Sequence, residues 1–265
     1  MTYRGAPNVE PDYRQLVMGE YKPMTSGQTL SRMKIVAGPD KADGRGLTIA
    51  SPPGGSLTDI TVNDCMIQSN GDDGICLWGN VQRIRLNRSW GIGRYQWPDP
   101  LDYTRTLKCF IAGADPDQPD PNYPDWFKAC DCSFMGGFRC PKITGGVFRF
   151  ERCYFGPSRR NVLTRATGDF VNCDFVVQVG MKTGPGDNNW SDSASVFVRP
   201  LCLEQPKPNS LYFKGCTLTV LDATGAVIRT GPADGPALCR MLVDGPVGSD
   251  VDVAANVFRS KANRK

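Results

Sequence analysis

Cysteine and arginine, rather than histidine, are the residues through which this chain could carry out chemistry. The 265 residues include eleven cysteines and no histidine. The lack of histidine excludes Ser-His-Asp and Cys-His catalysis, histidine-ligated metals and an imidazole pH switch. Any reaction must therefore use carboxylates, lysine, arginine, tyrosine or cysteine. Because eleven is an odd number, at least one cysteine is free or pairs with another chain.

The composition is that of a folded protein with a sizeable core. Apolar residues make up 40% and charged residues 22%, which excludes a disordered or collagen-like chain and suffices for one or two domains. The net charge of +4 does not by itself indicate nucleic-acid binding, and we expect no nucleic-acid partner. No apolar run approaches the roughly 18 residues of a membrane span, so we expect no membrane partner. The first residues show no secretory pattern, which favours synthesis in the cytoplasm without a signal peptide.

Two stretches rich in turn-forming residues are predicted to be loop insertions. Residues 95–125 contain six prolines and six aspartates, which indicates an exposed loop that could bind a partner. Residues 180–210 hold Trp190 among polar residues, where it could stack on a sugar, contact a protein or lie in a solvated loop. The aspartates of the first loop could also supply the acid and nucleophile of a hydrolase, although their spacing selects no pair.

The cysteines recur at one position of short strands with alternating polarity. Five segments, beginning with residues 60–67, alternate apolar and polar side chains and carry a cysteine near the end. Together with Ser89, the repeated cysteines follow one another at 20 to 24 residues, apart from a step of 43 that we interpret as two repeats. They are predicted to form a buried ladder of small side chains that packs the interior. The ladder comprises Cys65, Cys109, Cys132, Cys153, Cys173, Cys216 and Cys239.

This spacing predicts a parallel β-solenoid. Strands recur every 20 to 24 residues, with glycine and proline between them and no helical periodicity. We expect about eight coils in an all-β domain spanning 31–258, with the insertions at 95–125 and 180–210. Residues 1–30 are predicted to be an extended N-terminal arm, and residues 259–265 a basic C-terminal tail.

Four cysteines fall outside the ladder and are candidates for crosslinking. Each is either buried in another face of the coil or turned outward, where a free thiol would be reactive. An outward thiol could form a disulfide with a neighbouring molecule in an oxidising environment. These candidates are Cys76, Cys130, Cys140 and Cys202.

Two stretches resemble the central coils of the pectate-lyase-like β-helix superfamily. Residues 47–94 show the strand, acidic turn and glycine-ended strand of that family, and residues 129–156 are similar to the segment that carries its catalytic arginine. The resemblance covers about residues 45–175. It implies a single-stranded, right-handed parallel β-helix, in agreement with the period of the cysteines.

The resemblance also implies a lyase site. In that family an arginine abstracts the proton alpha to a uronate carboxylate, while calcium held by acidic side chains neutralises that carboxylate. By resemblance Arg139 is the base and Asp72 a calcium ligand, with Asp73 as a neighbour. Arg94 and Lys142 are the accompanying basic residues.

The chain departs from the family pattern at this site. Cys76 stands where a second calcium-ligating carboxylate is expected, and a thiol is a poor ligand for a hard cation. Residues 130–132 read Cys-Asp-Cys where the family has His-His-Asn. The retained residues also have structural interpretations. Asp72 suits a turn, and Arg139 could form an ion pair with Glu151 or with one of the exposed aspartates.

Two classes of function remain. The first is a structural or binding β-helix of a virus (phage) particle, such as a minor capsid, decoration or collar component, without a cofactor. Its partners would be other virion proteins or copies of itself in a symmetric assembly, stabilised by disulfides to neighbours. The alternative is a calcium-dependent polysaccharide lyase or phage glycan depolymerase that uses Arg139 as base. The degenerate calcium site and the odd cysteine count favour the structural class.

Overall fold

The computed structural model is built from β-strands, and the residues it describes contain no helix. The predicted all-β class is therefore confirmed. The described residues are 2–5, 25–37, 46–51, 54–69, 74–93, 110–113, 126–135, 141–143, 146–158, 162–164, 166–178, 196–198, 211–222, 224–233 and 239–241.

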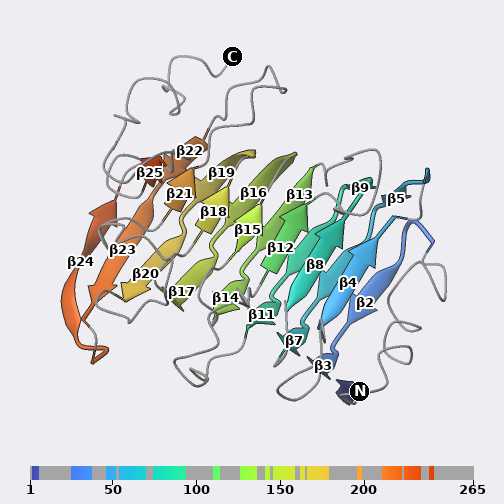
Figure 1. The fold of residues 1–265 in the computed structure, drawn as a ribbon, viewed down its shortest axis with the longest axis horizontal. Helices are drawn as coiled ribbons and strands as arrows, with labels where there is room; N and C mark the ends of the chain where they lie inside the picture. Colours follow the sequence, from blue (N-terminus) through green and yellow to red (C-terminus); the bar gives the residue numbers. More distant parts are fainter. Residues whose placement is uncertain are drawn as a thin grey trace, which may run out of the picture.

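The strands assemble into three large sheets and one small sheet (Figure 1). Sheet A contains, in spatial order, β1 (Thr2–Gly5), β3 (Lys34–Ala37), β7 (Met66–Ser69), β11 (Trp90–Ile92), β14 (Ser133–Met135), β17 (Tyr154–Ser158), β20 (Asp174–Gln178), β23 (Cys216–Leu221) and β24 (Val227–Ala233). Sheet B contains β2 (Thr29–Ser31), β6 (Thr61–Asn63), β10 (Arg85–Asn87), β13 (Phe127–Cys130), β16 (Val147–Glu151), β19 (Thr167–Val171) and β22 (Leu211–Lys214). Sheet C contains β4 (Leu47–Ala50), β8 (Ile75–Trp78), β12 (Phe110–Gly113), β15 (Lys142–Ile143), β18 (Val162–Thr164), β21 (Val196–Val198) and β25 (Cys239–Met241). Sheet D pairs β5 (Leu57–Thr58) with β9 (Val81–Gln82).

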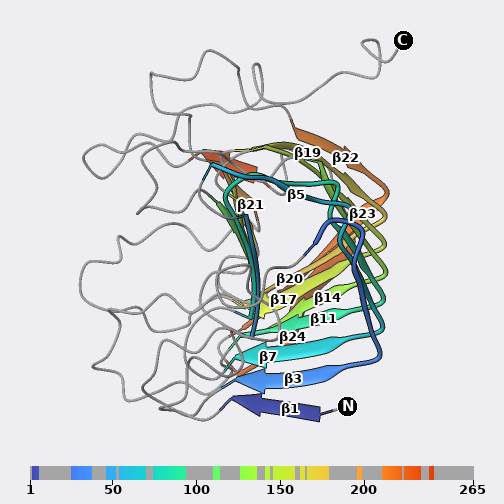
Figure 2. The ribbon, with the colours of Figure 1, turned by 90° about the vertical axis from the view of Figure 1, so that its right-hand side faces the viewer.

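The chain visits the three large sheets in a repeating order. A strand of sheet B is followed by one of sheet A and then one of sheet C, as in β6, β7 and β8. We call such a set a coil. Apart from β24, the strands of these sheets pair in parallel with their equivalents in adjoining coils, as β10 does with β6 and β13. Figure 2 shows the strands of sheet A following one another along one side of this stack. The arrangement is compatible with a β-solenoid.

Alternation along the strands explains why the interior is apolar. In β16 the burial alternates residue by residue, so that Phe148 and Phe150 point inward and Arg149 points outward. The parallel register stacks like positions on one another, and Phe150 lies between Ala129 and Phe170. The inward side chains from Ile35 to Val220 form one continuous apolar cluster.

Phenylalanine rings fill the later coils in two columns. In sheet A, the rings of Phe134, Phe155 and Phe175 stack with centroid separations of 5.4 and 4.9 Å. In sheet B, Phe150 and Phe170 stack at 5.5 Å. The two columns meet edge to face, with Phe150 and Phe155 5.1 Å apart and inclined at 83°. The rings therefore pack against one another both within each sheet and between sheets A and B.

The repeated cysteines lie at the turn between sheets B and A. Each lies two residues after the last residue of a sheet B strand, and each is buried. Ser89 takes the same place and is buried as well. We define the cysteine ladder by the residues found there, which are Cys65, Ser89, Cys132, Cys153, Cys173 and Cys216.

One of the other two predicted ladder cysteines does not belong to this turn. Cys239 is the first residue of β25 in sheet C. Spacing alone placed Cys239 in the ladder because a strand of any sheet recurs with the same period. Cys109 lies outside the described residues.

The predicted number of about eight coils agrees with sheet A. Among the described residues, sheet A contains eight parallel strands besides β24, whereas sheets B and C contain seven strands each. The 43 residues from Ser89 to Cys132, and again from Cys173 to Cys216, are one long coil rather than two. The predicted insertions 95–125 and 180–210 are not simple loops either, since they contribute β12 and β21 to sheet C.

The two ends of sheet A also depart from the prediction. Strand β1, inside the predicted N-terminal arm, pairs in parallel with β3. Strand β24 pairs antiparallel with β23 through a tight turn, in which the Asp222 carboxylate accepts hydrogen bonds from the backbone N–H groups of Thr224 and Ala226 at 2.8 and 3.0 Å. Parallel stacking in sheet A therefore ends at β23.

Candidate functional site

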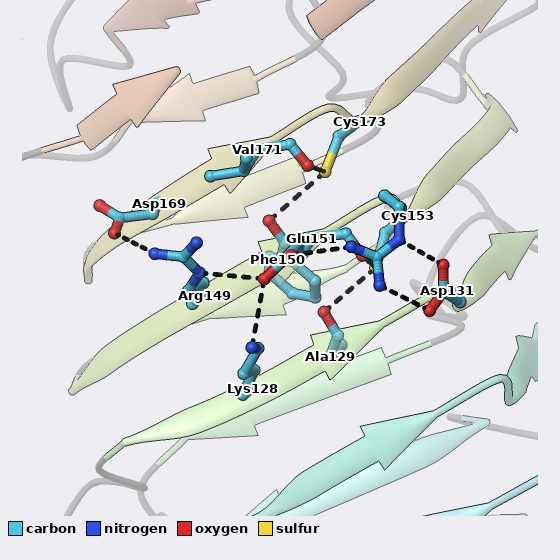
Figure 3. Close-up of polar contacts among 11 residues, drawn as sticks. Lys128, Ala129, Asp131, Arg149, Phe150, Glu151, Cys153, Asp169, Val171 and Cys173 are labelled. Atoms are coloured by element: carbon cyan, nitrogen blue, oxygen red, sulfur yellow. Dashed lines mark hydrogen bonds and ion pairs between the residues drawn. The ribbon is translucent and has the colours of Figure 1, made fainter. Parts of the chain in front are cut away.

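The richest polar arrangement lies on the outer face of sheet B and on the turn that follows it (Figure 3). On the face, Lys128, Arg149 and Asp169 occupy equivalent positions of three successive coils. Glu151 lies two residues after Arg149 on the same side of β16. We call these four residues the charged face. At the turn, the residues just before Met33 and before the first four members of the cysteine ladder alternate in charge. We call them the charge ladder: Arg32, Asp64, Arg88, Asp131 and Arg152.

The turn itself requires a left-handed backbone. All five residues of the charge ladder have φ between 47 and 55°, a conformation that most side chains disfavour. The later coils place Asn172 and Gly215 there, which adopt it more readily. Each turn is held by its neighbour, since the backbone N–H of Asp64 donates to the carbonyl of Asn87 and that of Arg88 to the carbonyl of Cys130.

Ion pairs between coils join the charge ladder. Arg88 donates two hydrogen bonds to the Asp64 carboxylate, at 2.7 and 2.9 Å. Arg152 likewise donates two hydrogen bonds to the Asp131 carboxylate, at 2.7 and 2.8 Å, in a bidentate ion pair. These hydrogen bonds lower the pKa values of both carboxyls, and the charges of Arg32 and Arg88 contribute to the effect.

Glu151 connects the charge ladder to the charged face. Its carboxylate lies 3.1 Å from Lys128 Nζ, 3.4 Å from Arg149 Nε and 2.8 Å from an Arg152 nitrogen. The hydrogen bond from Lys128 is the main cause of its lowered pKa. Arg149 also lies 3.7 Å from Asp169, which extends the network to the next coil. Figure 3 shows these side chains crossing three neighbouring strands.

This arrangement suits binding better than acid–base catalysis. A general acid at neutral pH needs a carboxyl whose pKa is raised. Here the pKa values of Asp64, Asp131 and Glu151 are all lowered, so each stays ionised. The face offers a fixed pattern of charges that can match an opposite pattern on another surface.

The lowered pKa values predict a loss of stability in acid. A matching pair, Arg83 with Asp59 at the turn after sheet D, holds the Asp59 pKa at about 2 through its hydrogen bonds. Because the unfolded carboxyls bind protons first, the stabilisation is complete above about pH 5 and is lost as the pH falls through the lowered folded values. We expect the thermal unfolding midpoint, measured by circular dichroism, to fall between about pH 4 and pH 2.

Asp59→Asn and added salt provide the controls for this pH dependence. The asparagine variant cannot titrate at this position, so its curve of unfolding midpoint against pH should be flatter than that of the wild type. About 1 M salt should shrink the effect, because these pairs are exposed. An unfolding midpoint that stays constant from pH 5 to pH 2 would contradict the prediction.

Most residues of the predicted lyase site lie outside the described part of the chain. This holds for Asp72, Asp73, Arg94 and Arg139. Lys142 begins β15 in sheet C, and only its backbone is described. The lyase site therefore stays a prediction.

The predicted crosslinking cysteines have different environments. Cys76 is fully buried in β8 and is not the outward thiol that a crosslink to a neighbour requires. It lies on the opposite side of the strand from Ile75 and Leu77, which belong to the apolar cluster. Cys130, at the end of β13, is partly exposed and has a free thiol. Cys140 and Cys202 lie outside the described residues. No disulfide joins the cysteines of the described segments.

The charge ladder is the feature that the spacing analysis missed, although its signal is visible in the sequence. The residue before each repeated cysteine or Ser89 alternates between aspartate and arginine in successive coils, from Asp64 to Arg152. Glu151, one of the possible partners considered for Arg139, forms ion pairs with Lys128 and Arg152 among the described residues.

Comparisons with known proteins found no match to any family model, curated protein or solved structure. In the part of the chain that the structure describes, no helix has the length and apolar character needed to cross a membrane. Within the same residues, no group of three or more cysteine or acidic side chains is arranged to hold a metal ion.

Proposed function

We propose that the chain is a structural, binding β-helix, a single right-handed parallel solenoid that packs against copies of itself or other proteins in a virus (phage) particle. The charged face of sheet B is the observation that carries this proposal. Because a fold by itself does not define a function, the argument rests on this surface and on the rigidity behind it.

The charged face is suited to a flat protein contact. Its residues lie in register on neighbouring parallel strands, so their charges are spaced by the sheet, at about 4.8 Å per coil. Their mutual ion pairs hold the side chains in place, which reduces the entropy lost on binding. A partner with the opposite order of charges would bind in one register only.

The packing behind the face supports a rigid building element. The apolar cluster runs without interruption from the first coils to the last, and stacked phenylalanine rings fill it on both sides. Solenoids of this kind present extended surfaces, which suit repeated contacts in a symmetric assembly. Of the crosslinking candidates that are described, Cys130 beside Lys128 is the one whose exposure fits a disulfide to a neighbour.

Purified particles provide the test. In particles isolated on a density gradient from the native source, we expect the chain to co-sediment with the particle proteins in a constant ratio. A double variant, Lys128→Glu with Arg149→Glu, reverses two charges of the face and should lower incorporation by roughly tenfold or more. Lys34→Glu reverses an exposed charge on sheet A and should leave incorporation unchanged.

Two further measurements make the outcome decisive. The double variant is compared with Lys128→Gln and Arg149→Gln, and the unfolding midpoint of each is recorded, so that loss of folding is not mistaken for loss of binding. A wild-type chain found only in particle-free fractions would overturn the proposal. A calcium-dependent release of unsaturated uronate from polysaccharide, abolished by Arg139→Lys, would instead favour the lyase alternative.

A further inference from the structure

Four thiols of the cysteine ladder lie in consecutive coils. Cys132, Cys153, Cys173 and Cys216 follow sheet B strands that pair directly with one another. Each of the four is at most 2% exposed. They therefore form an unbroken file of sulfur atoms along the inside of the turn.

Neighbouring thiols of this file occupy equivalent positions of adjoining coils. The strands that precede them pair in register, β13 with β16, β16 with β19 and β19 with β22. Each thiol also donates to a backbone carbonyl, as Cys153 does to that of Ala129 at 3.4 Å. Paired strands lie about 4.8 Å apart, which falls within the Cα separations of 4.4–6.8 Å usual for disulfides.

Ser89 interrupts the file before it reaches Cys65. The Ser89 hydroxyl accepts a hydrogen bond from the backbone N–H of Cys65 at 3.1 Å and donates to the carbonyl of Asn87 at 2.9 Å. On the other side of Cys65 the equivalent position is Met33. Among the described residues, Cys65 thus has no thiol in either adjoining coil, and it serves as a built-in comparison.

We infer that the four-thiol file is an oxidation site, at which hydrogen peroxide forms two disulfides between coils, one joining Cys132 to Cys153 and one joining Cys173 to Cys216. One thiol of a pair attacks a peroxide oxygen, so that an S–O bond forms, the O–O bond breaks, and a sulfenic acid and water result. The neighbouring thiol then attacks that sulfur, and an S–S bond forms as a second water leaves. Each pair loses two electrons and two protons, and one peroxide becomes two waters.

The geometry favours disulfides over deeper oxidation. A sulfenic acid next to a second thiol condenses with it, whereas an isolated one can be oxidised further. Of the possible pairings in a file of four, joining the two end pairs uses every thiol, while joining Cys153 to Cys173 leaves two without a partner. The reaction should be slow, because all four thiols are buried and peroxide reaches them only through local opening.

Oxidation would strengthen the stack. The two disulfides join cysteines that are 21 and 43 positions apart in the sequence, and so restrict the unfolded chain. The segment between Cys173 and Cys216 spans the long coil that contains β21. Peroxide treatment is therefore expected to raise the midpoint of unfolding in urea, and reductant to reverse the change.

The test is a map of thiols after graded treatment of the folded, reduced protein with hydrogen peroxide. The protein is then unfolded and alkylated, and its peptides are analysed by mass spectrometry. We expect these four thiols to disappear in pairs with the stated connections, while Cys65 stays fully alkylated. Cys130, which is partly exposed, reports that peroxide was active.

Two substitutions, Cys153→Ser and Ser89→Cys, test the predicted disulfide connections directly. Cys153→Ser copies the arrangement already present at Ser89, so Cys132 should remain alkylated while Cys173 and Cys216 still join. Ser89→Cys places a thiol beside Cys65 and should make Cys65 oxidisable. If Cys153→Ser does not fold, the wild-type map alone decides. Four thiols that stay alkylated after prolonged treatment, long past complete oxidation of Cys130, would overturn the inference. A disulfide between Cys153 and Cys173 would overturn it as well.

Discussion

Replacing Phe150 with alanine is expected to lower the free energy of unfolding by about 3–5 kcal/mol, the range found when large core rings are removed. Phe150 is fully buried and contacts rings from both columns, with Phe155 at 5.1 Å and Phe170 at 5.5 Å. It also meets Phe134 edge to face at 5.5 Å. The cavity would open at the point where sheets A and B interlock, so the surrounding coils have little freedom to close it.

Phe213→Ala is the matched control for this prediction. Phe213 continues the same column, 5.0 Å from Phe170, but it is only partly buried. Its removal should cost clearly less than that of Phe150. Both values come from urea unfolding followed by circular dichroism. Equal losses for the two variants would contradict the view that the junction of the columns carries most of the packing energy.

Gly168→Ala is expected to lower the free energy of unfolding by about 1–3 kcal/mol, the usual cost of overpacking a core. A Cβ at this position would lie 2.4–2.5 Å from three ring atoms of Phe148. The ring cannot swing away easily, because Phe150 and Phe170 lie against it at 5.3 and 5.2 Å. Gly168 is therefore the space into which the Phe148 ring fits in the adjoining coil.

The same substitution at Gly231 separates overpacking from the general effect of replacing glycine. A Cβ added to Gly231 in β24 meets no atom within 4 Å, so Gly231→Ala should cost less than about 0.5 kcal/mol. Adding Phe148→Leu to Gly168→Ala should recover part of the lost stability, because the smaller side chain leaves room for the methyl group. A Gly168→Ala protein as stable as the wild type would refute this explanation.

The sequence predicts the turn between sheets B and A well, because that turn has a local signature. A small buried residue follows each sheet B strand closely, and the alternation of β16 or β19 is readable from a few residues. The same local signal misplaced Cys239, because alternation and period do not say to which sheet a strand belongs. Sheet membership depends on the strand with which it pairs.

The ion pairs of the charged face could not be assigned from the sequence. The residues Lys128, Arg149 and Glu151 are visible as charged positions of predicted strands, and their outward direction follows from the alternation. Their ion pairs depend on the register between β13, β16 and β19. A register shifted by one residue would separate all these charges, so sequence spacing alone could not assign the partners.

The sequence by itself determined that this chain forms short β-strands with a buried thiol at a recurring turn. The alternation of apolar and polar residues and the preferences of turn residues act over only a few positions. Only the tertiary structure decided three further properties: each step of 43 residues is a single coil, four buried thiols follow one another in adjoining coils, and aspartate and arginine form ion pairs along the turn. These properties arise from contacts between residues 20 or more positions apart. Such contacts form only when one coil stacks on the next. Because the chain between two stacked strands is long, its sequence does not specify which strands pair.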